Sequence, residues 1–122
     1  MKKFAFTSVL IIIFLTISCD EESQFEKYEG AWVGTYSGGD NGSWNVNIDE
    51  DGNVSGIAAS DSAPGFPFDL NGSVTEDGKL EAQIPFFLDT LNFEGQFTNT
   101  DASGNWFNIN QGITGTWTGK KK

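Results

Sequence analysis

From Trp32 onward, apolar residues recur at every second position in short runs that are separated by glycine, aspartate and asparagine. Successive side chains of a β-strand point to opposite faces, so a period of two predicts strands with one buried and one exposed face. An amphipathic helix would show a period of 3.6 instead. The pattern predicts eight strands, at 31–37, 43–49, 53–59, 67–75, 79–85, 91–98, 104–110 and 113–119.

The segments between the strands predict how the strands connect. Asp51-Gly52 and Asp77-Gly78 are typical of tight type I′ hairpins, and Ala102-Ser103-Gly104 predicts a looser turn. Eight strands joined in sequence form a meander, and closing it removes both unpaired edges. The predicted fold is therefore all-β, an eight-stranded antiparallel up-and-down meander that closes into a small β-barrel.

Four glycines fall on the predicted inward faces beside aromatic residues: Gly34, Gly72, Gly95 and Gly115. In a narrow barrel, small inward residues leave room for large side chains across the axis. Strand coiling or bulges explain the same glycines equally well.

Alternating strand directions place the tight turns and both termini at one end of the barrel. The opposite end, called the loop end, receives 38–42, 60–66, 86–90 and 111–112. Aromatic residues at or near this end suit a small apolar ligand or a sugar face. The candidate ligand-binding residues are Tyr36, Trp44, Phe66, Phe68, Phe86, Phe87 and Trp106.

The same rings could instead plug the barrel, because side chains just fill an eight-stranded interior. An open cavity of roughly 300 Å³ or more would favour a pocket. A filled interior with an exposed aromatic patch on the wall would favour contact with another protein.

The chain begins with Met1-Lys2-Lys3, and an apolar run follows at 4–17. A helix of that run reaches only about 21 Å, which is short of the ~30 Å hydrocarbon core of a bilayer. A positive start, an apolar middle and a small residue before the cut are typical of a secretory signal, predicted here at 1–18.

Leu15-Thr16-Ile17-Ser18-Cys19 resembles a bacterial lipobox, which implies cleavage before Cys19 and lipidation of its thiol. Several tens of buried CH₂ groups at ~0.8 kcal/mol each would make the membrane attachment effectively permanent. The acidic residues 20–22 resemble the export signal of surface lipoproteins in some Gram-negative bacteria. In enteric bacteria, Asp after the cysteine implies retention at the inner membrane. The expected location is the cell envelope, at the outer membrane and its surface.

Residues 19–30 are predicted to form an acidic tether, in which Ser23 and Glu26 have the spacing of a capping box for a short helical turn. The barrel domain is expected at 31–122. The segment 25–32, with its Gly30-Ala31-Trp32, resembles the opening of the calycin families, which are the lipocalins, fatty-acid-binding proteins and avidins. This resemblance implies a barrel entered from a helical turn, and it carries no ligand contacts over to this chain.

Charge and composition exclude several functions. Without residues 1–18, five lysines face 17 acidic residues, and the chain has no arginine or histidine, so nucleic acid is not an expected partner. Nucleophilic catalysis lacks its base, and zinc lacks its ligands. Residues 49–53 space oxygen ligands like the start of a calcium loop, but Ser60 stands where its final Glu belongs, and a hairpin explains them equally. No enzyme activity, cofactor or metal is expected.

The resulting hypothesis is a non-enzymatic, lipid-anchored envelope protein with lipocalin-like binding of a small apolar molecule or sugar at the loop end. The alternative is a structural or accessory envelope lipoprotein whose filled barrel acts through contacts with other envelope proteins.

Overall fold

The computed structural model describes residues 24–86 and 89–122. The predicted signal, Cys19 and the acidic residues after it lie outside this range, as do Ser23 and Phe87. A short 3₁₀ helix, η3 (Glu26–Tyr28), precedes the sheet. The strands are β1 (Gly30–Gly38), β2 (Gly42–Ile48), β3 (Asn53–Ser60), β4 (Phe68–Val74), β5 (Lys79–Phe86), β6 (Asp89–Phe97), β7 (Asp101–Asn108) and β8 (Ile113–Lys121).

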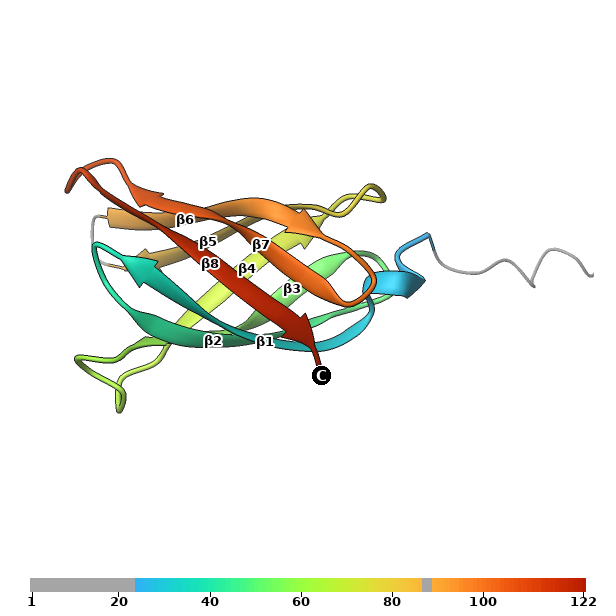
Figure 1. Ribbon diagram of the computed structural model, residues 1–122, viewed down its shortest axis with the longest axis horizontal. Helices are drawn as coiled ribbons and strands as arrows, with labels where there is room; N and C mark the ends of the chain where they lie inside the picture. The colour runs from blue at the N-terminus through green and yellow to red at the C-terminus, as the bar shows by residue number, and fades with distance from the viewer. Residues whose placement is uncertain (1–23, 87–88) are drawn as a thin grey trace, which may run out of the picture.

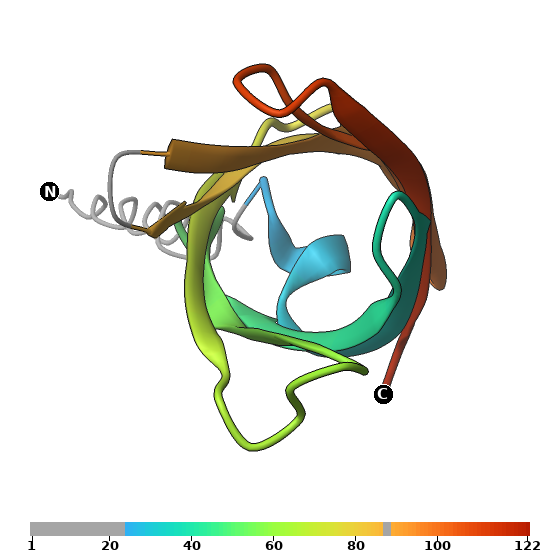
Figure 2. The same cartoon turned by 90° about the vertical axis from the view of Figure 1, so that its left-hand side faces the viewer.

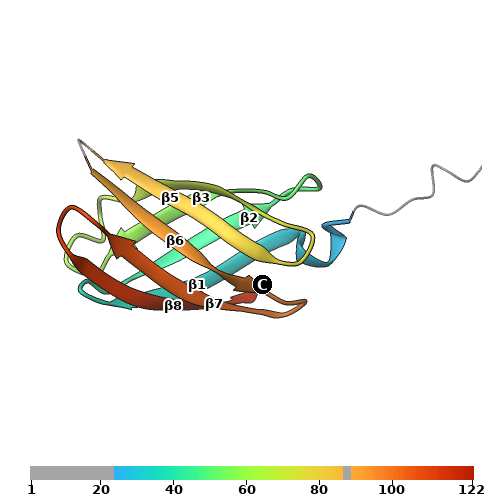
Figure 3. The same ribbon diagram turned by 90° about the horizontal axis from the view of Figure 1, so that it is seen from above.

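These strands form a closed antiparallel barrel in sequence order, as predicted. Strand β8 returns to pair with β1, with Gly34 opposite Gly119 and Tyr36 opposite Trp117. Figure 2 shows the resulting ring end on, and Figure 3 shows the strands crossing the barrel obliquely. Closure leaves neither end of the meander as an exposed edge, which is the physical reason that the sequence favoured a barrel.

The two ends of the barrel differ as predicted (Figure 1). The segments 49–52, 75–78 and 98–100 lie at the end that holds η3 and the C-terminus, whereas 39–41, 61–67 and 109–112 lie at the loop end. Among the described residues, no helix is long and apolar enough to cross a membrane.

The Asp-Gly turns form, but their geometry differs from the predicted type I′ hairpin. The backbone N–H of Gly52 donates to the carbonyl of Asp49 at 3.1 Å, so Glu50 and Asp51 are the central residues. Gly52 follows them with a φ of 83°, and Gly78 repeats this arrangement with a φ of 88°. Each glycine supplies the left-handed residue that returns a four-residue loop to its partner strand.

The carboxylate of Asp49 shapes the first of these hairpins. Its Oδ1 accepts from the backbone N–H groups of Asp51 and Asn53, both at 2.9 Å. These bonds lower the pKa of Asp49, chiefly through the N–H of Asn53. The residues that resembled a calcium loop therefore form a hairpin.

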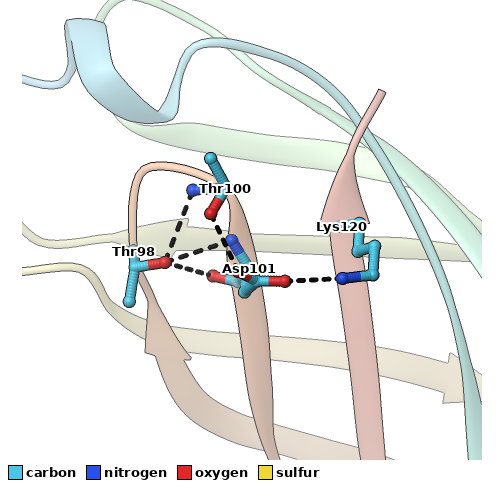
Figure 4. A network of polar contacts seen from close by, with 4 residues as sticks. All are labelled: Thr98, Thr100, Asp101 and Lys120. Carbon is cyan, nitrogen blue, oxygen red and sulfur yellow. Dashed lines mark hydrogen bonds and ion pairs between the residues drawn. The ribbon is translucent and has the colours of Figure 1, made fainter.

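The prediction of a turn at 102–104 is wrong, because these residues lie within β7. The turn comes earlier, where the backbone N–H of Thr98 donates to the carbonyl of Asp101 at 2.8 Å. Figure 4 shows the polar contacts that fix it: Thr100 Oγ1 donates to Asp101 at 2.8 Å, and Lys120 forms an ion pair with Asp101 at 2.9 Å. The Lys120 hydrogen bond is the main cause of a lowered Asp101 pKa.

Three of the four predicted inward glycines, Gly34, Gly95 and Gly115, lie against an indole, whereas Gly72 lies against Ala82. Gly34 lies directly opposite Trp44 on β2. Gly104 lies opposite Trp117 on β8 in the same way, and Gly115 lies opposite Trp106. These three indoles therefore lie over backbone that carries no side chain, which lets them fit within a narrow barrel.

The helical turn η3 closes the end opposite the loop end (Figure 2). Tyr28 is buried, and its hydroxyl donates to the Glu76 carbonyl at 3.2 Å. Trp32, which is fully buried, donates from Nε1 to the Tyr28 carbonyl at 2.8 Å. A short helical turn thus forms here with Phe25 at its N-cap, and Ser23 of the predicted capping box lies outside the described residues.

Candidate functional site

The interior of the barrel is nearly filled in this structure. It holds a cavity of about 20 Å³, far below the 300 Å³ of an ordinary small-molecule pocket. The condition for an open pocket is therefore not met. The lining is aliphatic and aromatic throughout: Trp44, Val46, Val54, Leu70, Leu80, Ala82, Phe93, Phe97 and Trp117.

An aromatic cluster lies beneath the loop end. Tyr36 meets Trp106 edge to face at 5.8 Å between ring centroids, and it meets Phe93 at 6.2 Å. Phe93 and Trp106 stack at 6.5 Å. The indole N–H of Trp106 donates to the Ser37 carbonyl at 3.0 Å, which fixes the ring against β1. These contacts join rings from β1, β6 and β7 into one layer.

The structure separates the predicted ligand-binding residues into two groups. Tyr36, Trp44 and Trp106 are buried inside the barrel rather than at its rim. Phe66 and Phe68 lie at the loop end, with exposed fractions of 74% and 39%. Phe86 ends β5, but its side chain lies outside the description, as does the whole of Phe87.

Asp40 connects three segments at the loop end. Its Oδ2 accepts from the Tyr36 hydroxyl at 3.3 Å, and its Oδ1 accepts from Ser60 Oγ at 3.0 Å. Ser60 Oγ also lies 2.9 Å from Ser62 Oγ. Burial raises the pKa of Tyr36 to about 12, and the negative charges of Asp40 and Asp61 add to the effect. At neutral pH the Tyr36 phenol therefore stays protonated and donates to Asp40.

This raised pKa predicts a late phenol titration. Tyr36 is one of two tyrosines in the chain, so replacing it isolates its part of the phenol titration. In a Tyr36→Phe variant, the phenolate absorbance step near pH 12 should disappear. An unfolded tyrosine loses its proton near pH 10, so stability should fall as the pH rises from about 10 towards 12, and less steeply in the variant. A Tyr36 step near pH 10 in folded protein would contradict this prediction.

The sequence did not predict the contacts of a second loop-end carboxylate, Asp89. Asp89 accepts from the side-chain amides of Asn108 at 2.9 Å, Asn110 at 3.0 Å and Gln111 at 3.4 Å. These bonds, led by the one from Asn108, lower the pKa of Asp89. Asn108 is only 1% exposed, and it also accepts from the backbone N–H of Gln111. Asp89 thus holds the 109–112 loop against β6.

One sequence signal could have revealed this cluster. If Trp106 points inward, the alternation along β7 also turns Asn108 inward, and a buried amide requires a partner. The predicted strand centred on Trp106, Phe107 and Ile109 instead, yet Ile109 is 77% exposed in the 109–112 loop.

The lysines are distributed unevenly between the two ends. Asp40, Asp61 and Asp89 lie at the loop end, where Asp69 follows the start of β4. Within residues 24–86 and 89–122, the lysines lie at the opposite end: Lys27, Lys79, Lys120, Lys121 and Lys122. The loop end is therefore negative, which disfavours an anionic ligand there.

Comparison with known proteins adds fold information. No family model matches the chain, and no curated protein matches it. The chain is similar to a solved structure described as a redesigned β barrel, mFAP1, bound to DFHBI, with a TM-score of 0.55 and 12% identity. The match covers 84% of this chain and 100% of that one. At this identity the likeness shows a shared small-barrel fold.

Proposed function

We propose that this chain is a non-enzymatic, lipid-anchored protein of the cell envelope that binds a small apolar molecule or a sugar at the loop end of its barrel. The observation that carries the proposal is the position of the most exposed apolar side chains. Phe66 at 74% and Ile109 at 77% both lie in loop-end segments, whereas Val33 and Ile57 on the wall reach only 36% and 39%. The two loops stand on opposite sides of the barrel mouth (Figure 2), where exposed apolar side chains suit a binding surface.

The surroundings of these residues support an uncharged ligand. Hydroxyl and carboxylate groups of Ser60, Ser62 and Asp40 lie beside the 61–67 loop and can bond to sugar hydroxyls. Aromatic rings supply the faces on which an apolar molecule or a sugar packs. The similar redesigned barrel was solved with a small molecule bound, which makes this ligand class reasonable for the fold.

Native mass spectrometry of the domain purified from its own cells tests the binding role. We expect a co-purified small molecule, and a rise in melting temperature when that molecule is added back. Phe68→Ser should weaken this response, while Ile57→Ser, which changes a wall residue of equal exposure, should not. Ligand-free protein whose melting temperature no member of an apolar and sugar panel alters would contradict the proposal.

The lipid anchor is tested separately by labelling cells with palmitate. Label should enter the wild-type protein and not a Cys19→Ser variant. Equal labelling of the two proteins would rule the anchor out without affecting the binding proposal.

One observation favours the alternative, an accessory protein that acts through protein contacts: the interior cavity of about 20 Å³ is too small for an ordinary ligand. In this case Phe66 and Ile109 would contact a partner protein. Crosslinking in intact cells should then trap a partner from the 61–67 loop, and the melting temperature should be indifferent to small molecules.

A further inference from the structure

The tripeptide Asn-Gly-Ser occurs twice in this chain, at 41–43 and at 71–73. An asparagine that precedes glycine deamidates most readily, because glycine has no side chain to hinder attack by its own backbone nitrogen. Both asparagines are exposed, so access to water does not distinguish them. With the same tripeptide at both places, a difference between their deamidation rates comes from the fold.

The fold holds the second copy inside a sheet. Asn71 lies within β4, opposite Ser55 on β3 and Gln83 on β5. Gly72, which follows it, is paired with both neighbouring strands as well. The Gly72 nitrogen can reach the Asn71 side-chain carbon only if the backbone leaves the extended conformation, so these ladder contacts must break first.

The first copy lies where a ladder ends. Asn41 belongs to the 39–41 loop, and Gly42 forms the terminal pair of the β1–β2 ladder, opposite Tyr36. Terminal pairs open at a much smaller cost in free energy than pairs inside a sheet. The Gly42 nitrogen is therefore free to attack far more often than the Gly72 nitrogen.

A hydrogen bond activates the Asn41 side chain for this attack. Its Oδ1 accepts from the backbone N–H of Gly38 at 3.3 Å. A donor at a carbonyl oxygen stabilises the negative charge that develops there when a nucleophile adds to the carbonyl carbon. The loop thus supplies both an electrophile held by a donor and a nucleophile at a fraying strand end.

We propose that Asn41 is a site of spontaneous deamidation that alters the loop end of the barrel. The Gly42 backbone nitrogen attacks the Asn41 side-chain carbonyl carbon, its proton leaves with the departing ammonia, and a succinimide ring forms. Water then opens the ring at either carbonyl and leaves aspartate or isoaspartate at position 41. Water is the only co-reactant, and no electrons are gained or lost. This inference goes beyond the proposed binding function and does not depend on it.

The modification acts on the 61–67 loop, because Asn41 holds its first residue. The Asn41 backbone carbonyl accepts from the Asp61 N–H at 2.8 Å. Aspartate at position 41 keeps this bond and adds a negative charge next to Asp40. Isoaspartate lengthens the main chain by one carbon and turns that carbonyl into a carboxylate outside it. The isoaspartate product therefore loosens the loop that carries Phe66.

Peptide mapping of the full-length protein tests the site. The purified protein is incubated in mildly alkaline buffer and digested with pepsin in acid, which halts the reaction, and the peptides are separated by liquid chromatography with mass spectrometry. We expect Asn41 to convert at least about 10-fold faster than Asn71, because opening a pair inside a sheet costs more than opening a terminal one. In urea-unfolded protein the two rates should become nearly equal.

Two matched variants test the consequence for the loop. Asn41→Gln keeps an amide but must close a larger ring, so the fast product should disappear, whereas Asn71→Gln should leave it unchanged. Hydrogen exchange of the Asp61 amide, followed by nuclear magnetic resonance, should accelerate as the wild-type protein and Asn71→Gln age. It should stay constant in Asn41→Gln.

The outcomes separate the site from its effect. Equal rates at the two asparagines in folded protein, or faster conversion of Asn71, would overturn the proposal. So would intact Asn41 after a time in which the unfolded protein converts fully. If Asn41 converts while Asp61 exchange stays constant, the modification site stands and its effect on the loop is wrong. Ligand binding by the unmodified protein is unaffected by any of these results.

Discussion

Gly34→Val should strongly destabilise the barrel. A Cβ at this position would lie 2.5 Å from Trp44 Cζ2 and 2.7 Å from the Gly119 Cα, and it would also contact the Thr118 carbonyl oxygen. Real Cβ atoms essentially never approach other atoms within 3.0 Å, and two of these three neighbours are backbone. The side chain cannot be accommodated by rotating the indole alone, so the β1–β8 pairing that closes the barrel must separate.

The free energy of unfolding should fall by about 3 kcal/mol or more, which is the upper range for overpacking. This is a large share of the 5–15 kcal/mol that typically stabilises a small domain. Urea denaturation followed by circular dichroism would measure it. Gly65→Ala is the matched control, because nothing lies within 4 Å of an added Cβ there, and its stability should stay within about 0.5 kcal/mol of the wild type. Equal urea midpoints for Gly34→Val and wild type would refute the packing of Trp44 over Gly34.

The strands could be predicted from sequence because their signals are local. Alternation and turn residues placed most strand ends within two residues of the observed ones, as in β2 and β3. Closure is a long-range property, but it followed from the need to pair β1 and β8. The predicted start of β7 was wrong. The hydrogen bond from the backbone N–H of Thr98 to the Asp101 carbonyl determines the turn, and the residue types of Ala102-Ser103-Gly104 do not reveal that bond.

The candidate site was predicted less well, because depth in a barrel depends on strand tilt and stagger. Alternation correctly turned Tyr36 and Trp44 inward, but their nearness to strand ends suggested the rim, and both proved to be buried. The Asp89 cluster joins residues 19 to 22 positions apart, which no local pattern reveals.

Trp32→Ala should lower the free energy of unfolding by about 3–5 kcal/mol, the range for removing a large buried aromatic side chain. Trp32 is fully buried, it meets Phe97 edge to face at 4.6 Å, and its N–H binds the Tyr28 carbonyl. Its removal leaves a cavity and also releases η3, which closes this end of the barrel. Urea midpoints should therefore fall sharply, and the near-ultraviolet circular dichroism of the aromatic core should weaken.

Trp32→Phe separates the two contributions of this residue, because it keeps much of the ring volume and removes the bond to Tyr28. The free energy of unfolding should fall less in Trp32→Phe than in Trp32→Ala. It should fall more than in Val33→Ala, a change on the outer wall where the side chain is 36% exposed. If Trp32→Ala and Val33→Ala cost the same, the end of the barrel that holds η3 does not depend on this ring. Phe25 and Tyr28 would then have to close it without Trp32, although both belong to the same packed cluster.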